Sequence, residues 1–264
     1  MYLPVYFVIR LQLLSAVGAE LRARLHLLTA RGADVRRFLL LTAVRAEFRA
    51  GGQLLTAVGA EAPLLCRRLL LNRRGGLLLL LRAHLEELRP EMGSYDCGSM
   101  NWLHTSLFLN PPAFLEELGK NMQEWGVKPE IEAFDPGMIA NAAYYLKKGV
   151  LKGPLHFQFC MGCANGIVGS TKNLVFMKET MDSLCPGSTW SCFGVGHSAM
   201  EIMYAGVAMG GHIRVGMEDN VMYAKGQLAE SNVQFVERAK RVIEEFGCQA
   251  ATPDEARQIL SLNK

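Results

Sequence analysis

The residues best suited to chemistry lie together between Gly210 and Asn220, which reads GGHIRVGMEDN. An apolar run there ends in two adjacent carboxylates, Glu218 and Asp219, and Arg214 precedes Glu218 by four positions. Residues four apart on an extended strand point to the same face, so Arg214 and Glu218 are predicted to project together. Asp219 faces the other way or bends in with the loop that follows. Such a cluster at a strand end could bind an anion and a metal ion in one place.

Polar side chains also mark the ends of other predicted strands. Ser94 begins the small polar stretch SYDCGSMN, and PEIEAFD contains Glu130, Glu132 and Asp135. Glu130 and Glu132 share one face of a strand because successive side chains alternate. Cys-x-x-Cys at 160–163 has no second pair with zinc-site spacing, so these cysteines are interpreted as small core residues.

These side chains must be positioned by an alternation of short apolar segments and longer helical segments. Strands are predicted at 94–98, 128–134, 156–162, 189–196 and 212–218. Helices are predicted at 112–125, 136–148, 170–184, 198–209 and 224–246, with a last one from 252 to 260. Such alternation predicts a parallel sheet.

Five βα units are therefore clear in residues 94–264, and at roughly 30 residues per unit the first 89 residues have room for three more. Eight units make a (β/α)₈ TIM-type barrel, whose active site lies at the C-terminal ends of the strands. An open doubly wound sheet is the alternative. The chain has no Gly-x-Gly-x-x-Gly fingerprint to support a dinucleotide site.

Composition divides the chain near residue 89. Residues 1–89 contain 14 Arg, no Lys, six acidic residues and 25 Leu, and LLSAVGAE-like octets recur every 13 or 14 residues. This segment could be a genuine Leu-rich helical region, a degraded or misread stretch, or a poorly determined sequence. We favour a divergent or corrupted start of the barrel, followed from residue 90 by its C-terminal part.

Charge and cysteine content limit the compartment and the partners. The net charge of +3 over 264 residues gives no reason to expect a nucleic-acid or membrane partner. The seven cysteines are odd in number and irregularly spaced, which argues against a disulfide framework. A cytoplasmic protein is predicted.

Six stretches taken together resemble the β-keto acid cleavage enzymes, the family that includes 3-keto-5-aminohexanoate cleavage enzyme. They are RPEMGSYDCGSMNW (89–102), KPEIEAFDPGMI (128–139), HFQFCMGCANGI (156–167), WSCFGVGHSAM (190–200), GGHIRVGMEDN (210–220) and ATPDEARQIL (251–260). The resemblance implies a (β/α)₈ barrel, a homotetramer and a divalent metal, typically Zn²⁺. It also implies a Claisen-type exchange in which a β-keto acid and acetyl-CoA give acetoacetate and a new acyl-CoA.

The resemblance also implies roles for individual residues. Glu218 matches the family's carboxylate metal ligand, and Asp219 matches the acid that orients a catalytic water or hydroxide. Arg214 matches the arginine that acts in deprotonation and substrate positioning. Glu132 is the best match for the acid that contacts the variable end of the substrate, and Ser94 is a second candidate substrate-binding residue.

The family's other two metal ligands are the histidines of an early His-x-His motif, which this chain does not contain. Arg24-Leu25-His26 could be a decayed form of it. The alternative to a metal-dependent enzyme is therefore a catalytically inactive barrel or assembly partner that lacks the histidine pair.

Overall fold

The computed structural model describes residues 83–262, which belong to one compact unit of the chain. Helix α5 (Ala83–Leu88) opens this part and ends at the predicted compositional boundary. The Leu-rich octets and the His26 stretch lie outside the described residues. The division of the chain at residue 89 therefore stays a prediction.

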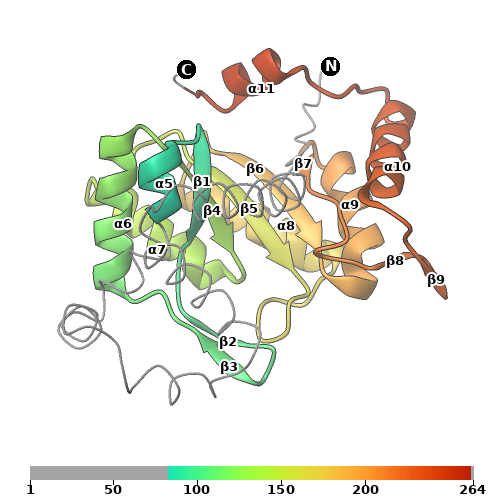
Figure 1. Cartoon of the computed structure of the whole chain (residues 1–264), viewed down its shortest axis with the longest axis horizontal. Helices are drawn as coiled ribbons and strands as arrows, with labels where there is room; N and C mark the ends of the chain where they lie inside the picture. Colours follow the sequence, from blue (N-terminus) through green and yellow to red (C-terminus); the bar gives the residue numbers. More distant parts are fainter. Residues whose placement is uncertain (1–82, 263–264) are drawn as a thin grey trace, which may run out of the picture. The chain divides into compact units, whose positions relative to one another are not determined.

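The core of the described part is a parallel sheet of five strands (Figure 1). In spatial order the strands are β1 (Met92–Asp96), β4 (Lys128–Ala133), β5 (His156–Met161), β6 (Thr189–Gly194) and β7 (His212–Ile213). Each strand pairs in parallel with the next strand along the chain, apart from the small hairpin between β1 and β4. The predicted five-stranded parallel sheet is confirmed, and within the described residues its order shows no reversal of the doubly wound kind.

Helices connect the strands and pack against one another in chain order. The connecting helices are α6 (Pro112–Trp125), α7 (Pro136–Lys147), α8 (Thr171–Leu184) and α9 (Ala199–Ala208), and α10 (Asn232–Glu245) and α11 (Pro253–Ile259) follow β7. Helix α7 packs on α8, α8 on α9, and α9 on α10, so these helices form a row (Figure 1). Right-handed crossovers between successive parallel strands place the connecting helices on the same face of a sheet.

The starts of these helices follow from local chemistry. Proline occupies the first turn of α6 and α7, where its missing N–H costs nothing. The Asp135 side chain accepts a hydrogen bond from the Met138 N–H, and Ser170 caps α8 in the same way. Thr252 and Glu255 form a reciprocal capping box at α11. These prolines and caps explain why the predicted starts of α6, α7, α8 and α11 agree with the structure to within one residue.

The two faces of the sheet differ in chemistry. The face toward the helices is apolar: the Tyr95 hydroxyl donates to the Leu115 carbonyl of α6 at 2.7 Å, and Ile131, Phe157 and Ile213 are fully or almost fully buried. The opposite face carries two rows of paired positions, Ser94–Glu130–His156–Thr189 and Asp96–Glu132–Gln158–Ser191–His212. All of these except Thr189 are buried.

A parallel sheet is normally apolar on both faces because helices cover both. Here the polar face is buried as well, and it therefore has to satisfy its own hydrogen bonds. A sheet with a buried polar interior on one side and helices on the other is suited to hold a polar ligand.

Two segments differ from the prediction. Strand β7 ends at Ile213, five residues before the predicted end, because the amides of Asp219 and Asn220 both donate to the Gly216 carbonyl and turn the chain. Residues predicted as the start of a long helix instead form the hairpin β8 (Met222–Ala224) and β9 (Gln227–Leu228), and α10 begins only at Asn232. A second hairpin, β2 (Met100–Trp102) and β3 (Ser106–Phe108), was not predicted.

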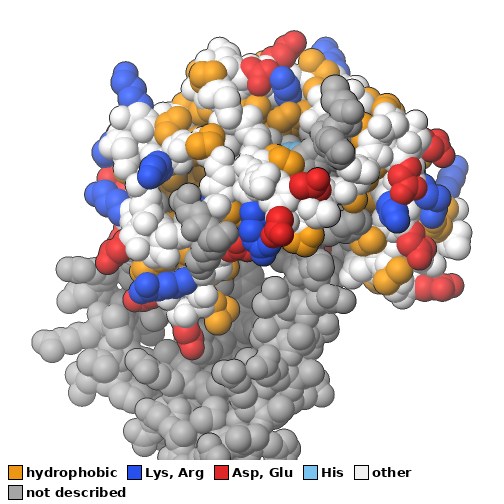
Figure 2. Space-filling model, turned by 90° about the horizontal axis from the view of Figure 1, so that it is seen from above, with side chains coloured by type: hydrophobic (Ala, Val, Ile, Leu, Met, Phe, Trp, Pro, Cys, Tyr) orange, Lys and Arg blue, Asp and Glu red, His pale blue; other side chains and the backbone are white. Residues whose placement is uncertain are grey.

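Acidic and basic side chains are interspersed with apolar ones on the face shown in Figure 2. Among the described residues no helix combines the length and the hydropathy needed to span a bilayer.

The burial of Ile131 against the helices predicts unequal effects of mutation at buried and exposed positions. Ile131→Ala removes a fully buried side chain from the helix face and should cost about 2–5 kcal/mol of unfolding free energy. Val233→Ala, at the exposed start of α10, should stay within about 0.5 kcal/mol of the parent chain. Urea unfolding followed by circular dichroism measures both free energies, and equal losses would contradict the burial of Ile131.

Candidate functional site

The candidate site lies where the chain leaves β7. The Arg214 amide still donates to the Cys192 carbonyl at 3.0 Å, so Arg214 stays in register with β6 after β7 has ended. The loop that follows is held from two sides. The Gly196 amide donates to the Asp219 carbonyl at 2.9 Å, and the Met217 amide donates to the Asn232 side chain at 2.8 Å. The sequence GMED thus folds into a turn that is anchored to the segment that follows β6 and to α10.

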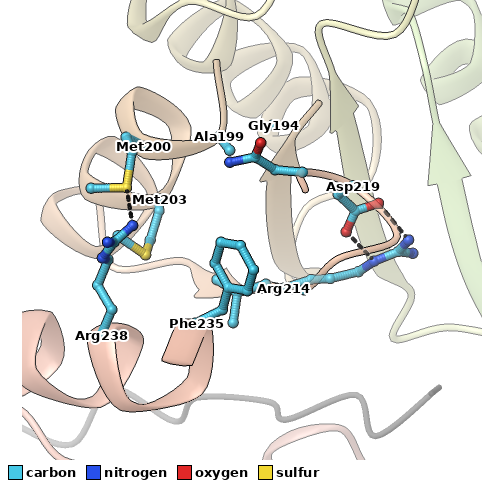
Figure 3. A pocket seen from close by; sticks show the side chains of 11 residues that line it. Gly194, Ala199, Met200, Met203, Arg214, Asp219, Phe235 and Arg238 are labelled. Carbon is cyan, nitrogen blue, oxygen red and sulfur yellow. Dashed lines mark hydrogen bonds and ion pairs between the residues drawn. The ribbon is translucent and has the colours of Figure 1, made fainter. Parts of the chain in front are cut away.

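This turn brings Asp219 inward onto Arg214 (Figure 3). Arg214 Nε donates to Asp219 Oδ2 at 2.9 Å and Nη2 donates to Oδ1 at 2.7 Å, a bidentate pair in which both side chains are only 8% exposed. Arg214 also lies over the Phe193 ring, with its Cζ 4.1 Å from the ring centroid. Bidentate geometry fixes orientation as well as charge.

Glu218 is the outer partner of the same guanidinium. Its Oε2 lies 3.2 Å from Arg214 Nη2, but its side chain is 46% exposed. The predicted approach of Arg214 to Glu218 is therefore observed. The predicted cause, a shared face of one strand, was wrong, because β7 ends at Ile213 and neither residue belongs to it. Of the two orientations open for Asp219, the inward one is found.

The surrounding charges shift the acidity of this pair. Burial raises the pKa of Asp219 to about 6, and Glu218 and Glu132 add to the rise, against the opposing attraction of Arg214. Burial alone would lower the pKa of Arg214, but Asp219, Glu132 and Glu218 outweigh it and raise that pKa. The guanidinium consequently stays charged, and Asp219 can exchange a proton near neutral pH.

Glu132 belongs to the same electrostatic group. It is 6% exposed on the polar face of β4. Burial raises the pKa of the Cys160 thiol well above its usual range, Glu132 raises it further, and Arg214 opposes the rise. Asp96 and Asp219 also raise the pKa of Cys160, so all three acids act electrostatically on the same thiol. Asp96, which pairs in register with Glu132, was missed by the sequence prediction.

Ser94 lies one register row further toward the N-terminal ends of the strands. It is the partner of Glu130 across β1 and β4, and it is 7% exposed. The structure thus brings Arg214, Glu218 and Asp219 together and places Glu132 within their electrostatic reach. It places Ser94 on the same polar face but outside that group.

Three buried side chains that the sequence analysis did not select connect to Arg214. Arg214 Nη1 donates to Gln158 Oε1 at 3.3 Å, Gln158 Nε2 donates to Ser191 Oγ at 2.9 Å, and Ser191 Oγ lies 3.3 Å from His156 Nε2. The available signal was the polar–apolar alternation of HFQFC and TWSCF. Reading it required aligning two strands that are far apart in the sequence.

Two cavities meet at Asp219. One has a volume of about 20 Å³, enough for roughly one water molecule, and Arg214, Phe235 and Gly194 are among its lining residues (Figure 3). The other has a volume of about 560 Å³, within the range of small-molecule sites. It is lined by Val195, Gly196, His197, Met200, Met217, Glu218, Asp219, Asn220, Val221, Met222, Tyr223, Ala224, Lys225 and Gly226.

The described residues do not fit a zinc site by themselves. Within residues 83–262 no three His, Cys, Asp or Glu side chains are grouped so that they could hold a metal ion. Glu218 offers one exposed carboxylate, and zinc sites use three or four protein ligands.

Buried pairing of Arg214 and Asp219 predicts strong thermodynamic coupling. Arg214→Met leaves a buried carboxylate unpaired and should cost about 3–5 kcal/mol, whereas adding Asp219→Asn to it should recover part of that loss. Unfolding free energies of the two single variants and the double variant form the cycle. Additive losses would show that the two side chains do not act as a pair.

The raised pKa of Asp219 makes the stability of the folded chain depend on pH. The pKa of Asp219 is raised in the folded state, so its contribution to stability is present below about pH 4 and is lost as the pH rises through about 6. Removal of Arg214 takes away the opposing attraction, so the Arg214→Met variant should lose stability more steeply than the parent chain between pH 4 and about 7. Parallel pH profiles would contradict this expectation.

Comparison with known proteins gives matches to a family model and to curated relatives. A model of the beta-keto acid cleavage enzyme family matches residues 77–262. The chain is 47% identical over 189 residues to a 3-keto-5-aminohexanoate cleavage enzyme from Fusobacterium nucleatum, covering 72% of this chain and 68% of the relative. It is 39% identical over 183 residues to a 3-dehydrocarnitine:acetyl-CoA trimethylamine transferase from Rhizobium meliloti, covering 69% of this chain and 60% of the relative.

Among solved structures, ObcA in a binary complex with oxaloacetate superimposes with a TM-score of 0.60 at 19% identity, over 72% of this chain and 50% of ObcA. That likeness concerns the fold alone. The chain spans about half of ObcA and 60 to 68% of the two curated relatives. The match over 77–262 and the 47% identity to a curated relative establish that the chain belongs to the beta-keto acid cleavage enzyme family.

Proposed function

We propose that the protein cleaves a β-keto acid by a Claisen-type exchange with acetyl-CoA, which yields acetoacetate and a new acyl-CoA. The carrying observation is the buried bidentate pair of Arg214 and Asp219, in which Asp219 lines the 560 Å³ cavity. Membership of the family supports the reaction class. The names of two relatives, a 3-dehydrocarnitine:acetyl-CoA trimethylamine transferase and a 3-oxoadipate:acetyl-CoA acetyltransferase, support acetyl-CoA as the co-substrate.

The five strands are inferred to be consecutive members of a closed (β/α)₈ barrel. Their sequential order, the row of helices and the buried polar face all suit a barrel interior. In that architecture the loops after the strands form the active site. The turn that carries Glu218 and Asp219 is such a loop.

The geometry supports different roles for Arg214 and Asp219 in the proposed reaction. Arg214 is a fixed cation that can bind the carboxylate of the β-keto acid or the enolate oxygen. Asp219, with a raised pKa of about 6, accepts the proton from the carbon between the keto and carboxylate groups. The resulting enolate carbon bonds to the acetyl carbonyl carbon, and the thiolate of coenzyme A leaves.

The exchange is completed by the reverse chemistry. The released thiolate attacks the original keto carbon, and the bond between that carbon and the former enolate carbon breaks. The departing fragment takes back a proton and leaves as acetoacetate, while the remainder leaves as the acyl-CoA. In total one C–C bond and one C–S bond are formed, and one C–C bond and one C–S bond are broken, so no oxidant or reductant is required.

Three further assignments form part of the proposal. Glu132 contacts the variable end of the substrate, and Ser94 binds substrate on the same polar face. Glu218 is the proposed carboxylate ligand of a divalent metal, but the described residues supply no second and third ligand. The steps above therefore use only side chains of the described chain. A homotetramer in the cytoplasm, with no nucleic-acid or membrane partner, stays a prediction.

The second candidate function is a barrel without activity that assembles with active relatives. One observation favours it: the chain has no His-x-His, and residues 83–262 group no metal-binding donors. Metal content of the purified full chain separates the two functions. About one zinc per chain, lost in Glu218→Ala, supports the enzyme, and metal-free protein that makes no acetoacetate supports the assembly partner.

Activity is predicted to depend on the carboxylate of Asp219. The full chain incubated with acetyl-CoA and a panel of β-keto acids should form acetoacetate, and Asp219→Asn should lower kcat by about 10²–10⁴-fold. Asp182→Asn is a matched control, since Asp182 is a half-exposed carboxylate paired with Lys178 on α8. A folded protein that forms no acetoacetate with any substrate would refute the assignment.

Glu132 is predicted to select substrates with a cationic end. A buried carboxylate strengthens binding of a positive group by about 1.5–3 kcal/mol through a charged hydrogen bond. Glu132→Gln should therefore raise KM at least about tenfold for amino-substituted β-keto acids, and much less for neutral ones. Equal changes in KM for both kinds of substrate would mean that Glu132 does not contact that end.

A further inference from the structure

The Arg214 guanidinium makes one hydrogen bond to a described residue outside its own loop. Nε and Nη2 point to Asp219 and Glu218, which lie on the turn after β7. Nη1 instead donates to Gln158 Oε1 at 3.3 Å, and Gln158 lies on β5, two strands away in the sheet. The cation is thus tied both to a loop and to a strand.

Hydrogen-bonding capacity determines the orientation of the Gln158 amide. A guanidinium has only donors, so the amide must present its oxygen to Arg214 and its nitrogen to the other side. There Nε2 donates to Ser191 Oγ at 2.9 Å. The hydroxyl of Ser191 remains free to donate to His156 Nε2 or to the Phe157 carbonyl, both 3.3 Å away. A flipped amide would place the N–H groups of Gln158 against those of Arg214.

Burial makes this arrangement rigid. Gln158 is 1% exposed and Ser191 is 2% exposed, so water does not compete for their hydrogen bonds. Both side chains stand on central strands of the sheet, at positions paired in register. Groups supported by strands hold their geometry more closely than groups supported by loops.

The other contacts leave one motion of the guanidinium unrestrained relative to the sheet. The ring of Phe193 restricts its tilt but not its rotation within its own plane. The Asp219 carboxylate restricts that rotation, but only relative to the turn that carries it. Gln158 restricts the rotation relative to the sheet, and it is the acceptor that the described strands supply to Arg214 Nη1.

We propose that Gln158, oriented by Ser191, is a positioning residue that fixes the in-plane orientation of the Arg214 guanidinium and, through it, of Asp219. This inference rests on the proposed function for its kinetic consequence, but the geometric part stands without it. A small error in placing reacting groups can cost about 10²-fold in rate.

Gln158→Met tests the proposal, because methionine has a similar length and cannot accept from Arg214. It should lower kcat about 10- to 100-fold while KM changes less than about threefold, because the loss concerns alignment rather than substrate binding. Ser191→Ala, which frees the amide to rotate, should give a smaller loss in kcat of the same kind. It tests the proposal by a second route that keeps Gln158 in place.

The matched control is Gln123→Met. Gln123 is an exposed residue of α6 that donates to the Gly149 and Val150 carbonyls, far along the chain from the site. This variant loses two hydrogen bonds but should keep the kcat of the parent chain. A kcat loss in Gln123→Met that matches its loss in Gln158→Met would assign the effect to general stability and overturn the proposal.

A direct readout separates this inference from the proposed function. In the full chain labelled with ¹⁵N-arginine, the Nε–H resonance of Arg214 is assigned by its disappearance in Arg214→Lys. Its exchange with water should be at least about tenfold faster in Gln158→Met than in the parent chain or in Gln123→Met. Unchanged exchange in both Gln158→Met and Ser191→Ala overturns the inference. Faster exchange in a protein that forms no acetoacetate sustains the inference and refutes the proposed function.

Discussion

The structure depends on keeping one guanidinium and its carboxylate out of water. Arg214 and Asp219 are each 8% exposed, and removing such charges from water costs several kcal/mol per ion. Their mutual attraction offsets that cost only when the geometry is good and the remaining donors find acceptors. The stacking on Phe193 and the contact with Gln158 meet those conditions. The site is therefore stable because the sheet beneath it is polar.

That requirement explains the unequal faces of the sheet. Alternation along a strand places Ile131 among the helices and Glu132 on the polar face, one residue apart. The helix face can supply the hydrophobic free energy of the fold, so the polar face is free to carry buried acids, amides and hydroxyls. The helix face thus stabilises the fold and the polar face carries the polar site, and the strand register keeps the two sets of side chains on opposite faces.

Local patterns predicted most of the fold, whereas tertiary contacts decided what they missed. Proline and cap residues placed the starts of α6, α7, α8 and α11, and apolar runs placed the five strands. The end of β7 was missed because the turn depends on the Gly196 amide and on the Asn232 side chain, both remote in sequence. The spacing of Arg214 and Glu218 indicated a cluster, but it could not show that Asp219 is its buried member. Gln158 was missed since its partners lie on other strands.

Asp219 on the turn and Gln158 on β5 both accept hydrogen bonds from Arg214, but they affect the chemistry differently. A carboxylate on a turn can approach or leave the guanidinium as the turn moves, and its pKa changes with that distance. A neutral amide on a strand contributes no charge and does not move with the turn. Gln158 can therefore hold the cation in place during a proton transfer without changing the charge of the site. A strand-bound carboxylate at the same position would compete with Asp219 for Arg214, which is a physical reason for an amide there.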